Sequence, residues 1–196
     1  MTRLHEENLN TAEHFNELWT RQGIHRYDIE RQKEFLKYID SGKALDVGAG
    51  LFGFAQYAIE FNLKPNVKFH AIDFSENALA LAKQKAPSLK CTLADFSKRI
   101  PFENDCFDMV GSGEVIEHME DPKAFAKELV RVCRPQGFIV ISTVDTNCVA
   151  AKAHGDYPEH LYEFTKEDLI GFFSPYGATA WRLLGNYHMI YCRKFI

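Results

Sequence analysis

Two spacings of apolar residues alternate along the middle of the chain, and together they predict most of its helices and strands. Short apolar runs occupy 43–48, 67–73, 89–95, 106–112 and 137–143, and such runs are typical of buried strands. Between them, at 53–63, 75–86 and 121–133, apolar residues recur as they do in helices, and Ser75 and Asp121 stand at helix-cap positions. Repeated strand–helix units predict a parallel sheet with helices on both faces.

The two ends of the chain follow other patterns. In the first 40 residues the apolar positions are spaced as in amphipathic helices, and Gly42 is a common helix stop. Residues 165–173 predict a short helix capped by Thr165, and 178–185 and 188–195 predict two strands with a tight antiparallel link. We therefore expect one domain over residues 1–196, with a helical extension or lid at 1–41 and the core at 42–196.

Composition and charge narrow the class of protein. The 196 residues are 46% hydrophobic and 26% charged, which is ordinary for a globular domain, and the net charge of −4 argues against a nucleic-acid partner. The five cysteines include no CxxC pair, the first ten residues have no apolar core, and no apolar run approaches the roughly 20 residues of a membrane span. We therefore expect a cytoplasmic protein with reduced thiols, no signal peptide and no membrane partner.

The loop LDVGAGLFG at 45–53 is the first stretch that points to chemistry. Its glycines, Gly48, Gly50 and Gly53, follow directly after a predicted strand. In an open parallel sheet, ligands bind at the carboxyl ends of the strands, and glycines there allow a sharp turn and a close approach of the backbone to a ligand. A plain strand-to-helix turn explains the glycines equally well, so the loop needs support from other residues.

Carboxylates at three strand ends supply that support. Asp46 and Asp73 end the first two predicted strands, and Asp95 ends the third with Phe96 beside it. A carboxylate at the position of Asp73 suits the two hydroxyls of a ribose, and one at Asp95 suits an exocyclic amine. Three carboxylates suit a ligand with cationic and hydroxyl groups, and they suit a pyrophosphate poorly. A nicotinamide enzyme would also place an apolar residue where Asp46 stands.

The chain resembles the class I S-adenosylmethionine-dependent methyltransferases, of the small-molecule type that includes the ubiquinone-pathway O-methyltransferases. The resemblance runs from about residue 43 to residue 195. It rests on four segments in that family's order: LDVGAG, AIDFSENAL, LADFSKRIPFENDCFDMV and GEVIEHMEDPKAFAKELVRVCRPQGFIVIST. The resemblance implies an α/β fold with a Rossmann-like, doubly wound sheet of seven strands, mostly parallel with an antiparallel last strand. It also implies an enzyme whose cofactor is S-adenosyl-L-methionine.

The resemblance also assigns roles to residues at matching positions. Methionine contacts would come from the glycine loop, ribose contacts from Asp73, and adenine contacts from Asp95 and Phe96. The full implied cofactor-binding set is Asp46, Gly48, Ala49, Gly50, Asp73, Phe74, Ala94, Asp95, Phe96, Gly113 and Glu114. The family's third glycine usually stands where this chain has Phe52, with Gly53 one position later. Phe52 must therefore point away from the cofactor or narrow the pocket.

The stretch GEVIEH at 113–118 holds the candidate catalytic group, and three interpretations stay open. On a helical turn, Glu114, Glu117 and His118 share one face. In the first interpretation His118 is a general base for a hydroxyl acceptor, since histidine titrates near neutral pH. In the second, the three residues hold a divalent metal together with His154 or His160, a pattern similar to metal-dependent ubiquinone-type and small-RNA 2′-O-methyltransferases. In the third, the stretch is a structural turn.

The expected function is transfer of a methyl group to a hydroxyl or amine of a small molecule by in-line displacement. Two alternatives come from other classes: a metal-dependent RNA 2′-O-methyltransferase, which would need a basic groove, and a non-catalytic regulatory protein that binds S-adenosylmethionine. The connection at 145–164 predicts either an acceptor wall, formed by Tyr157, His160, Tyr162 and Phe164, or a packed loop. The sequence indicates neither the acceptor nor the oligomeric state.

Overall fold

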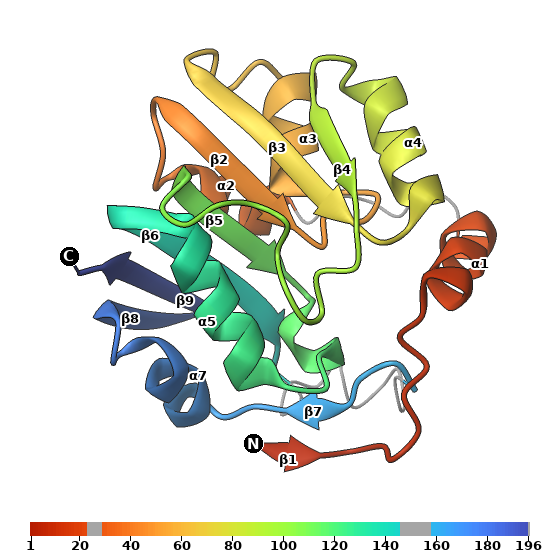
Figure 1. The fold of residues 1–196 in the computed structure, drawn as a ribbon, viewed down its shortest axis with the longest axis vertical. Coiled ribbons are helices and arrows are strands. Elements are labelled where there is room, and N and C mark those ends of the chain that lie inside the picture. Colours follow the sequence, from red (N-terminus) through yellow and green to blue (C-terminus); the bar gives the residue numbers. More distant parts are fainter. Residues whose placement is uncertain (23–28, 146–157, 196) are drawn as a thin grey trace.

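The centre of the protein is a seven-stranded sheet with the order β4–β3–β2–β5–β6–β9–β8 (Figure 1). The computed structural model describes residues 1–22, 29–145 and 158–195. The strands of the sheet are β2 (Gly42–Val47), β3 (Val67–Asp73), β4 (Lys90–Leu93), β5 (Phe107–Gly113), β6 (Cys133–Val144), β8 (Gly177–Leu184) and β9 (Tyr187–Lys194).

The pairing of the strands confirms the predicted topology. β2 is parallel to β3 and to β5, and the outer pairs β3–β4 and β5–β6 are parallel as well. The last strand, β9, is antiparallel to both of its neighbours, β6 and β8. Because β2 has β3 on one side and β5 on the other, the direction of winding reverses at β2, which is where an open α/β sheet forms its ligand crevice.

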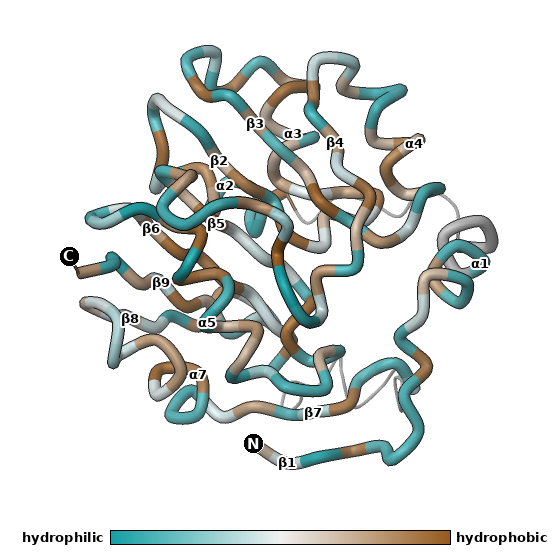
Figure 2. Tube along the Cα trace, viewed as in Figure 1, coloured by the Kyte–Doolittle hydropathy of each residue, from teal (hydrophilic) through white to brown (hydrophobic). Residues whose placement is uncertain are grey.

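Helices cover both faces of the sheet and bury a hydrophobic core on each. One core contains Phe35 of α2 (Ile29–Leu36) and Phe54 of α3 (Phe54–Glu60), together with residues of α4 (Glu76–Lys85). The other contains Phe125 of α5 (Pro122–Val132) and Phe173 of α7 (Lys166–Phe173). Figure 2 shows hydrophobic segments along the central strands, with mostly hydrophilic turns at the periphery.

Three helices begin with the caps that the sequence predicts. The Ser75 hydroxyl accepts a hydrogen bond from Ala78 N at the start of α4. The Asp121 carboxylate accepts one from Ala124 N at the start of α5. Thr165 forms a reciprocal capping box at the start of α7. These side chains satisfy backbone N–H groups that have no partner within the helix, so each helix starts at a defined residue.

The expectation of a helical segment over residues 1–41 is wrong for residues 1–11. Helices are present at α1 (Ala12–Gln22) and α2, but β1 (Thr2–Arg3) pairs antiparallel with β7 (Tyr162–Glu163). The backbone of residue 4 extends this contact, since Leu4 N donates to Leu161 O at 2.8 Å. The partners of residues 2–4 lie far away in the sequence, so helical periodicity could not reveal them.

Two further expectations concern the cysteines and the membrane. Cys91, Cys106, Cys133 and Cys192, which are the cysteines within the described ranges, are unpaired thiols. In that same part of the chain, no helix combines the length and the apolar character needed to cross a bilayer.

Candidate functional site

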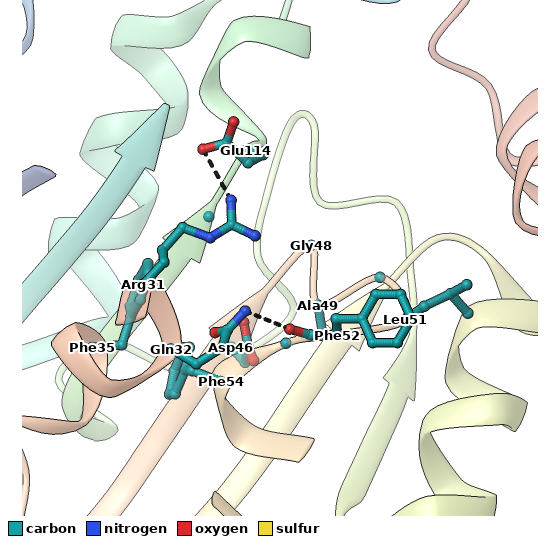
Figure 3. Close-up of a pocket in the computed structure, with 13 residues that line it drawn as sticks. Arg31, Gln32, Phe35, Asp46, Gly48, Ala49, Leu51, Phe52, Phe54 and Glu114 are labelled. Carbon is teal, nitrogen blue, oxygen red and sulfur yellow. Dashed lines mark hydrogen bonds and ion pairs between the residues drawn. The ribbon is translucent and has the colours of Figure 1, made fainter. Parts of the chain in front are cut away.

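Two adjoining pockets lie at the carboxyl ends of the central strands. The smaller, which we call the arginine pocket, has a volume of about 190 Å³ and lies between α2, the glycine loop and the end of β5 (Figure 3). The larger, which we call the histidine pocket, has a volume of about 790 Å³. It is bounded by the loop, the ends of β3 and β4, the 3₁₀ turn η1 (Ile116–His118) and the N-terminal segment. Gly48, Gly50 and Glu114 line both pockets.

The structure brings most of the predicted cofactor residues to these pockets. The arginine pocket is lined by Asp46, Ala49 and Gly113, the histidine pocket by Asp73, Phe74, Asp95 and Phe96, and both by Gly48, Gly50 and Glu114. Ala94 is the exception. Its side chain packs against the hydrophobic core, and its N–H donates to Asp73 O at 3.0 Å. Ala94 therefore supports the end of β3 and does not line either pocket.

The loop after β2 needs its first glycine for a steric reason. Gly48 has a φ of 68°, a left-handed conformation that side chains rarely adopt, and a Cβ there would lie 2.4 Å from Val115 Cγ2. Gly50 also has a positive φ, of 53°, and its N–H donates to Asp73 Oδ2 at 2.8 Å. The glycine loop is therefore hydrogen-bonded to β3 through Gly50, and it packs closely against Val115 at Gly48.

Gly53 has no room for a side chain because Asp46 occupies the space beside it. A Cβ on Gly53 would lie 2.3 Å from Asp46 Oδ2 and 3.0 Å from Ala49 O. The same Oδ2 accepts a hydrogen bond from Ala55 N at 2.9 Å, which ties Asp46 to the first turn of α3. Phe52 is not crowded in this way. Its ring extends away from Asp46 (Figure 3), and Lys85 Nζ lies 5.5 Å from the ring centre.

Asp73 and Asp95 differ in burial. Asp73 is 4% exposed, and its oxygens accept hydrogen bonds from Ser75 N and Gly50 N, both at 2.8 Å. Burial raises the pKa of Asp73 above its usual value, although these bonds oppose the shift. Each oxygen can accept a second hydrogen bond, so the carboxylate can still bind a pair of hydroxyls. Asp95 is exposed and accepts a hydrogen bond from Ser97 N at 2.9 Å.

Glu114 and Arg31 form an ion pair between the two pockets. Arg31 Nη1 lies 3.2 Å from Glu114 Oε1 (Figure 3), and the Ser142 hydroxyl donates to the same oxygen at 3.1 Å. Burial raises the pKa of Glu114 to about 7, while the charge of Arg31 opposes the shift. Glu114 also has a φ of 57°, which is strained for a residue with a side chain.

The sequence analysis missed Arg31. It extends from α2 into the arginine pocket, its guanidinium lies 4.6 Å from the centre of the Tyr187 ring, and its charge also lowers the pKa of Asp46. Burial nevertheless raises the pKa of Asp46 to about 7. In the sequence, Arg31 is one of several charges on an amphipathic helix. Its partners come from β2, β5 and β9, so no local signal distinguished it.

His118 lies on the histidine pocket as a neutral imidazole with a defined tautomer. Its Nδ1 is 2.8 Å from Glu159 O, and because a carbonyl oxygen only accepts, we assign the ring proton to Nδ1. The lone pair is then on Nε2. Burial lowers the pKa of His118 below its usual value, so the neutral form is favoured at pH 7. A neutral imidazole with a free Nε2 can accept a proton or bind a metal.

Glu117 and His160 join His118 in a compact group. One ligand atom from each of these three residues lies within 4.8 Å of the others. Glu117 is 1% exposed, and within the described ranges its oxygens make no hydrogen bond of regular geometry, although the Thr143 hydroxyl favours the charged form. Burial raises the pKa of Glu117 to about 7 and lowers that of His160 to about 3. This group can hold a divalent cation. Glu114, the fourth candidate, pairs with Arg31 instead, and His154 lies outside the described residues.

Within the described residues, the 145–164 connection contributes no side chain to the lining of the histidine pocket, although an acceptor wall was one of its two predicted roles. The Tyr162 hydroxyl donates to Glu120 O, and Phe164 is buried against Phe172, so both anchor the chain as a packed segment does. Tyr157 lies outside the described residues. The wall comes instead from the N-terminal segment, through Asn8, Asn10, Thr11, Ala12 and Phe15. Sequence analysis missed the polar residues Asn8, Asn10 and Thr11 because they belong to a segment that it predicted to be helical.

Comparisons with known proteins agree with this architecture. Residues 45–141 match a family described as a methyltransferase domain. The chain is 38% identical over 109 residues to tocopherol O-methyltransferase of Arabidopsis thaliana. The aligned region covers 52% of this chain and 30% of that protein. The chain is also 31% identical over 116 residues to demethylmenaquinone methyltransferase of Bacillus cytotoxicus. That aligned region covers 56% of this chain and 48% of that protein. The chain therefore spans about half the length, or less, of these curated relatives.

A solved structure with a similar fold is phosphoethanolamine N-methyltransferase 2 of Haemonchus contortus in complex with S-adenosyl-L-methionine. It matches 95% of this chain and 58% of its own chain with a TM-score of 0.71, at 16% sequence identity. At this identity the similarity concerns the fold, and it confirms the α/β architecture described above.

Replacing Gly53 with alanine tests the packing of the loop. We expect Gly53→Ala to lower the free energy of unfolding by about 1–3 kcal/mol, because the new Cβ would overlap Asp46 Oδ2. The matched control is Gly171→Ala in α7, where the added Cβ has no heavy atom within 4 Å and alanine favours the helix by about 0.5–1 kcal/mol. Urea denaturation measures both variants. Equal stabilities would contradict the steric role of Gly53.

The buried carboxyl groups predict a decline in stability as the pH rises. In the folded protein Glu117 keeps its proton up to about pH 7, whereas its ordinary value is 4.5, so the unfolded chain releases the proton at lower pH. The folded state binds more protons between these values, and the free energy of unfolding falls as the pH increases through them. Glu117→Gln should reduce the difference in stability between pH 5 and pH 8 by about 1–3 kcal/mol.

Urea denaturation at a series of pH values, without added ligand, measures this effect. Glu7→Gln, at an exposed position, is the control and should leave the pH dependence unchanged. A pH dependence that is the same in Glu117→Gln and in the unmodified protein would show that Glu117 is not buried as a protonated acid.

Proposed function

Because this chain belongs to the class I S-adenosylmethionine-dependent methyltransferases, we propose that it transfers a methyl group to a hydroxyl or amine of a small-molecule acceptor. The observation that carries the proposal is the pair of adjoining pockets, with carboxylates along both and one guanidinium in the smaller. The acceptor of the whole enzyme is included in this proposal, because this chain spans only part of the length of its relatives.

The two pockets suit the two ends of S-adenosyl-L-methionine. Asp73, with an acceptor position left on each oxygen, suits the ribose hydroxyls in the histidine pocket, and Phe74 and Asp95 suit adenine. Asp46 and Arg31 in the arginine pocket suit the charged ends of an amino acid. Gly48 and Glu114 line both pockets, so they would flank the sulfonium. When bound, the cofactor supplies an electrophilic methyl group on a positively charged sulfur.

A nucleotide with a pyrophosphate would fit these pockets poorly. Asp46, Asp73 and Glu114 all line them, and three carboxylates repel a phosphate group while they attract a cation. This argument from charge favours a sulfonium ligand over a nicotinamide dinucleotide.

We assign His118 the role of general base toward a hydroxyl acceptor. Its neutral ring with the lone pair on Nε2 can take the proton that the acceptor oxygen must lose. Most of the rate enhancement in such a reaction comes from holding the acceptor in line with the methyl group and excluding water. The walls of the histidine pocket, in particular Phe15 and Phe74, would do this.

The group of Glu117, His118 and His160 supports a second role for the same turn. A divalent cation there would lower the pKa of a bound acceptor hydroxyl and fix its position. The two roles of His118 make different demands on its neighbours, because a base acts alone whereas a metal site needs all of its ligands.

Replacing Arg31 tests the placement of the amino-acid end. Arg31→Met should weaken the binding of S-adenosylmethionine about 10- to 100-fold, which corresponds to about 1.5–3 kcal/mol for a hydrogen bond to a charged group. Decarboxylated S-adenosylmethionine has no carboxylate to lose, so it should bind Arg31→Met as tightly as the unmodified protein or more tightly. Isothermal titration calorimetry measures both ligands.

The matched control is Lys33→Met on the same helix, where the lysine is half exposed and forms a local ion pair with Glu30 at 3.0 Å. It should leave both affinities unchanged. An equal loss of affinity for the two ligands in Arg31→Met would mean that Arg31 supports the pocket and does not contact the carboxylate.

Replacing His118 tests the catalytic assignment and the proposed reaction together. Release of S-adenosylhomocysteine is measured with a panel of hydroxyl and amine compounds. With an acceptor that reacts, His118→Gln should lower kcat about 10²- to 10⁴-fold, the usual contribution of a general base, while cofactor affinity stays within about twofold. If no compound in a broad panel reacts although the cofactor binds, the proposed function fails.

The same assay separates the base from the metal. With His118 as a base, Glu117→Gln, His160→Gln and prior dialysis against EDTA should leave kcat largely intact. With a metal, each of the three treatments should reduce kcat as strongly as His118→Gln does, and added divalent ions should restore only the dialysed protein.

A further inference from the structure

The N-terminal segment is attached to the histidine pocket at two places, one near His118 and one near Asp73. We call residues 1–16 the N-terminal strap. It begins beside β7 and ends in α1, which lies beside the start of α4 (Figure 1). Its Asn10 and Phe15 line the histidine pocket. Phe15 lies edge-on to His118, with ring centres 5.7 Å apart, and edge-on to Phe74 at 5.3 Å.

Asn10 and His14 of the strap hold the residue whose carbonyl orients His118. Glu159 O accepts a hydrogen bond from His118 Nδ1 at 2.8 Å and a second from Asn10 Nδ2 at 2.9 Å. The Glu159 side chain lies 3.0 Å from His14 Nε2, so a second strap residue holds the same residue from another side. The orientation of His118 therefore depends on an oxygen atom that the strap fixes in place.

The C-terminal end of the strap, at Asn16, is bound beside Asp73. Asn16 Oδ1 accepts a hydrogen bond from the Ser75 hydroxyl at 2.7 Å, and the Asn77 side chain donates to Asn16 O at 3.3 Å. Ser75 N in turn donates to Asp73 Oδ1 at 2.8 Å. The strap thus connects the carboxylate proposed for the ribose with the histidine proposed for the acceptor.

We propose that Asn10 and His14 are positioning residues, which hold the Glu159 carbonyl so that His118 keeps its proton on Nδ1 and presents Nε2 to the acceptor. This proposal rests on the proposed function, since it assigns a task to the same histidine. Both residues act through Glu159. His14 is outside the set of residues that line the pocket, so its effect would not come from contact with the acceptor.

The test compares two substitutions of His14. His14→Ala removes the contact with Glu159 and should lower kcat about tenfold or more, because a displacement of about 1 Å at a reacting group has effects of up to about 100-fold. His14→Gln keeps a side chain that can donate to the Glu159 carboxylate and should retain most of the activity. The affinity for S-adenosylmethionine should change little in either variant. Glu13→Gln, at the adjacent exposed position of α1, is the control.

A second measurement does not depend on activity. The ¹⁵N chemical shifts of the His118 ring report which nitrogen carries the proton. In the unmodified protein at neutral pH they should indicate a neutral ring with the proton on Nδ1, and in Asn10→Ala and His14→Ala they should indicate a mixture of tautomers. Unchanged shifts and an unchanged kcat in both alanine variants would overturn the proposal.

The design separates this proposal from the proposed function. If the unmodified protein binds no S-adenosylmethionine, the proposed function fails, yet the ring shifts still show whether the strap controls His118. If it binds the cofactor and methylates an acceptor while Asn10→Ala and His14→Ala behave like it, only the role of the strap is wrong. Thermal denaturation shows whether each variant is folded. If Asn10→Ala is not folded, the comparison of His14→Ala with His14→Gln decides.

Discussion

The burial of several carboxylates around one glycine loop is the constraint on which the rest of this site depends. Asp46 and Asp73 are 2% and 4% exposed, and burial raises the pKa of each, as it does for Glu114 beside the loop. Removing a carboxylate from water is costly unless it is paired or hydrogen-bonded. Arg31 and a few backbone N–H groups compensate only part of this cost, so the site retains an affinity for positive charge. A sulfonium ligand with an ammonium group meets that requirement.

The same crowding explains the unusual backbone of the site. Gly48 and Gly53 are needed because side chains there would overlap Val115 and Asp46. Glu114, at a φ of 57°, is held by Ser142, whose carbonyl accepts from Glu114 N at 3.0 Å. Backbone strain of this kind persists when the surrounding structure fixes it, and it concentrates at functional sites.

The sequence predicted the parts of the fold that depend on local pattern. The strands β2 and β3, which carry Asp46 and Asp73 near their carboxyl ends, and the caps of α4, α5 and α7 follow from periodicity and side-chain type. β6 begins at Cys133, four residues before the predicted start, because Pro135 and Gly137 resemble a turn although Cys133 pairs with Phe107. Contacts between distant segments, such as those of β1 with β7 and of Arg31 with Glu114, leave no periodic signal. Those contacts are what the sequence analysis missed.

The family's matched region and the segments around it contribute different residues to the site. The matched region, residues 45–141, contains the glycine loop, Asp73, Asp95 and His118. Arg31, the strap and Glu159, which border the same pockets or orient His118, lie outside it. Relatives named for tocopherol and for demethylmenaquinone match 52% and 56% of this chain. If the matched region binds the cofactor, the segments around it are free to diverge with the acceptor. The acceptor of this protein should then be sought in the chemistry of the strap, whose Asn8, Asn10 and Phe15 line the same pocket as Asp73.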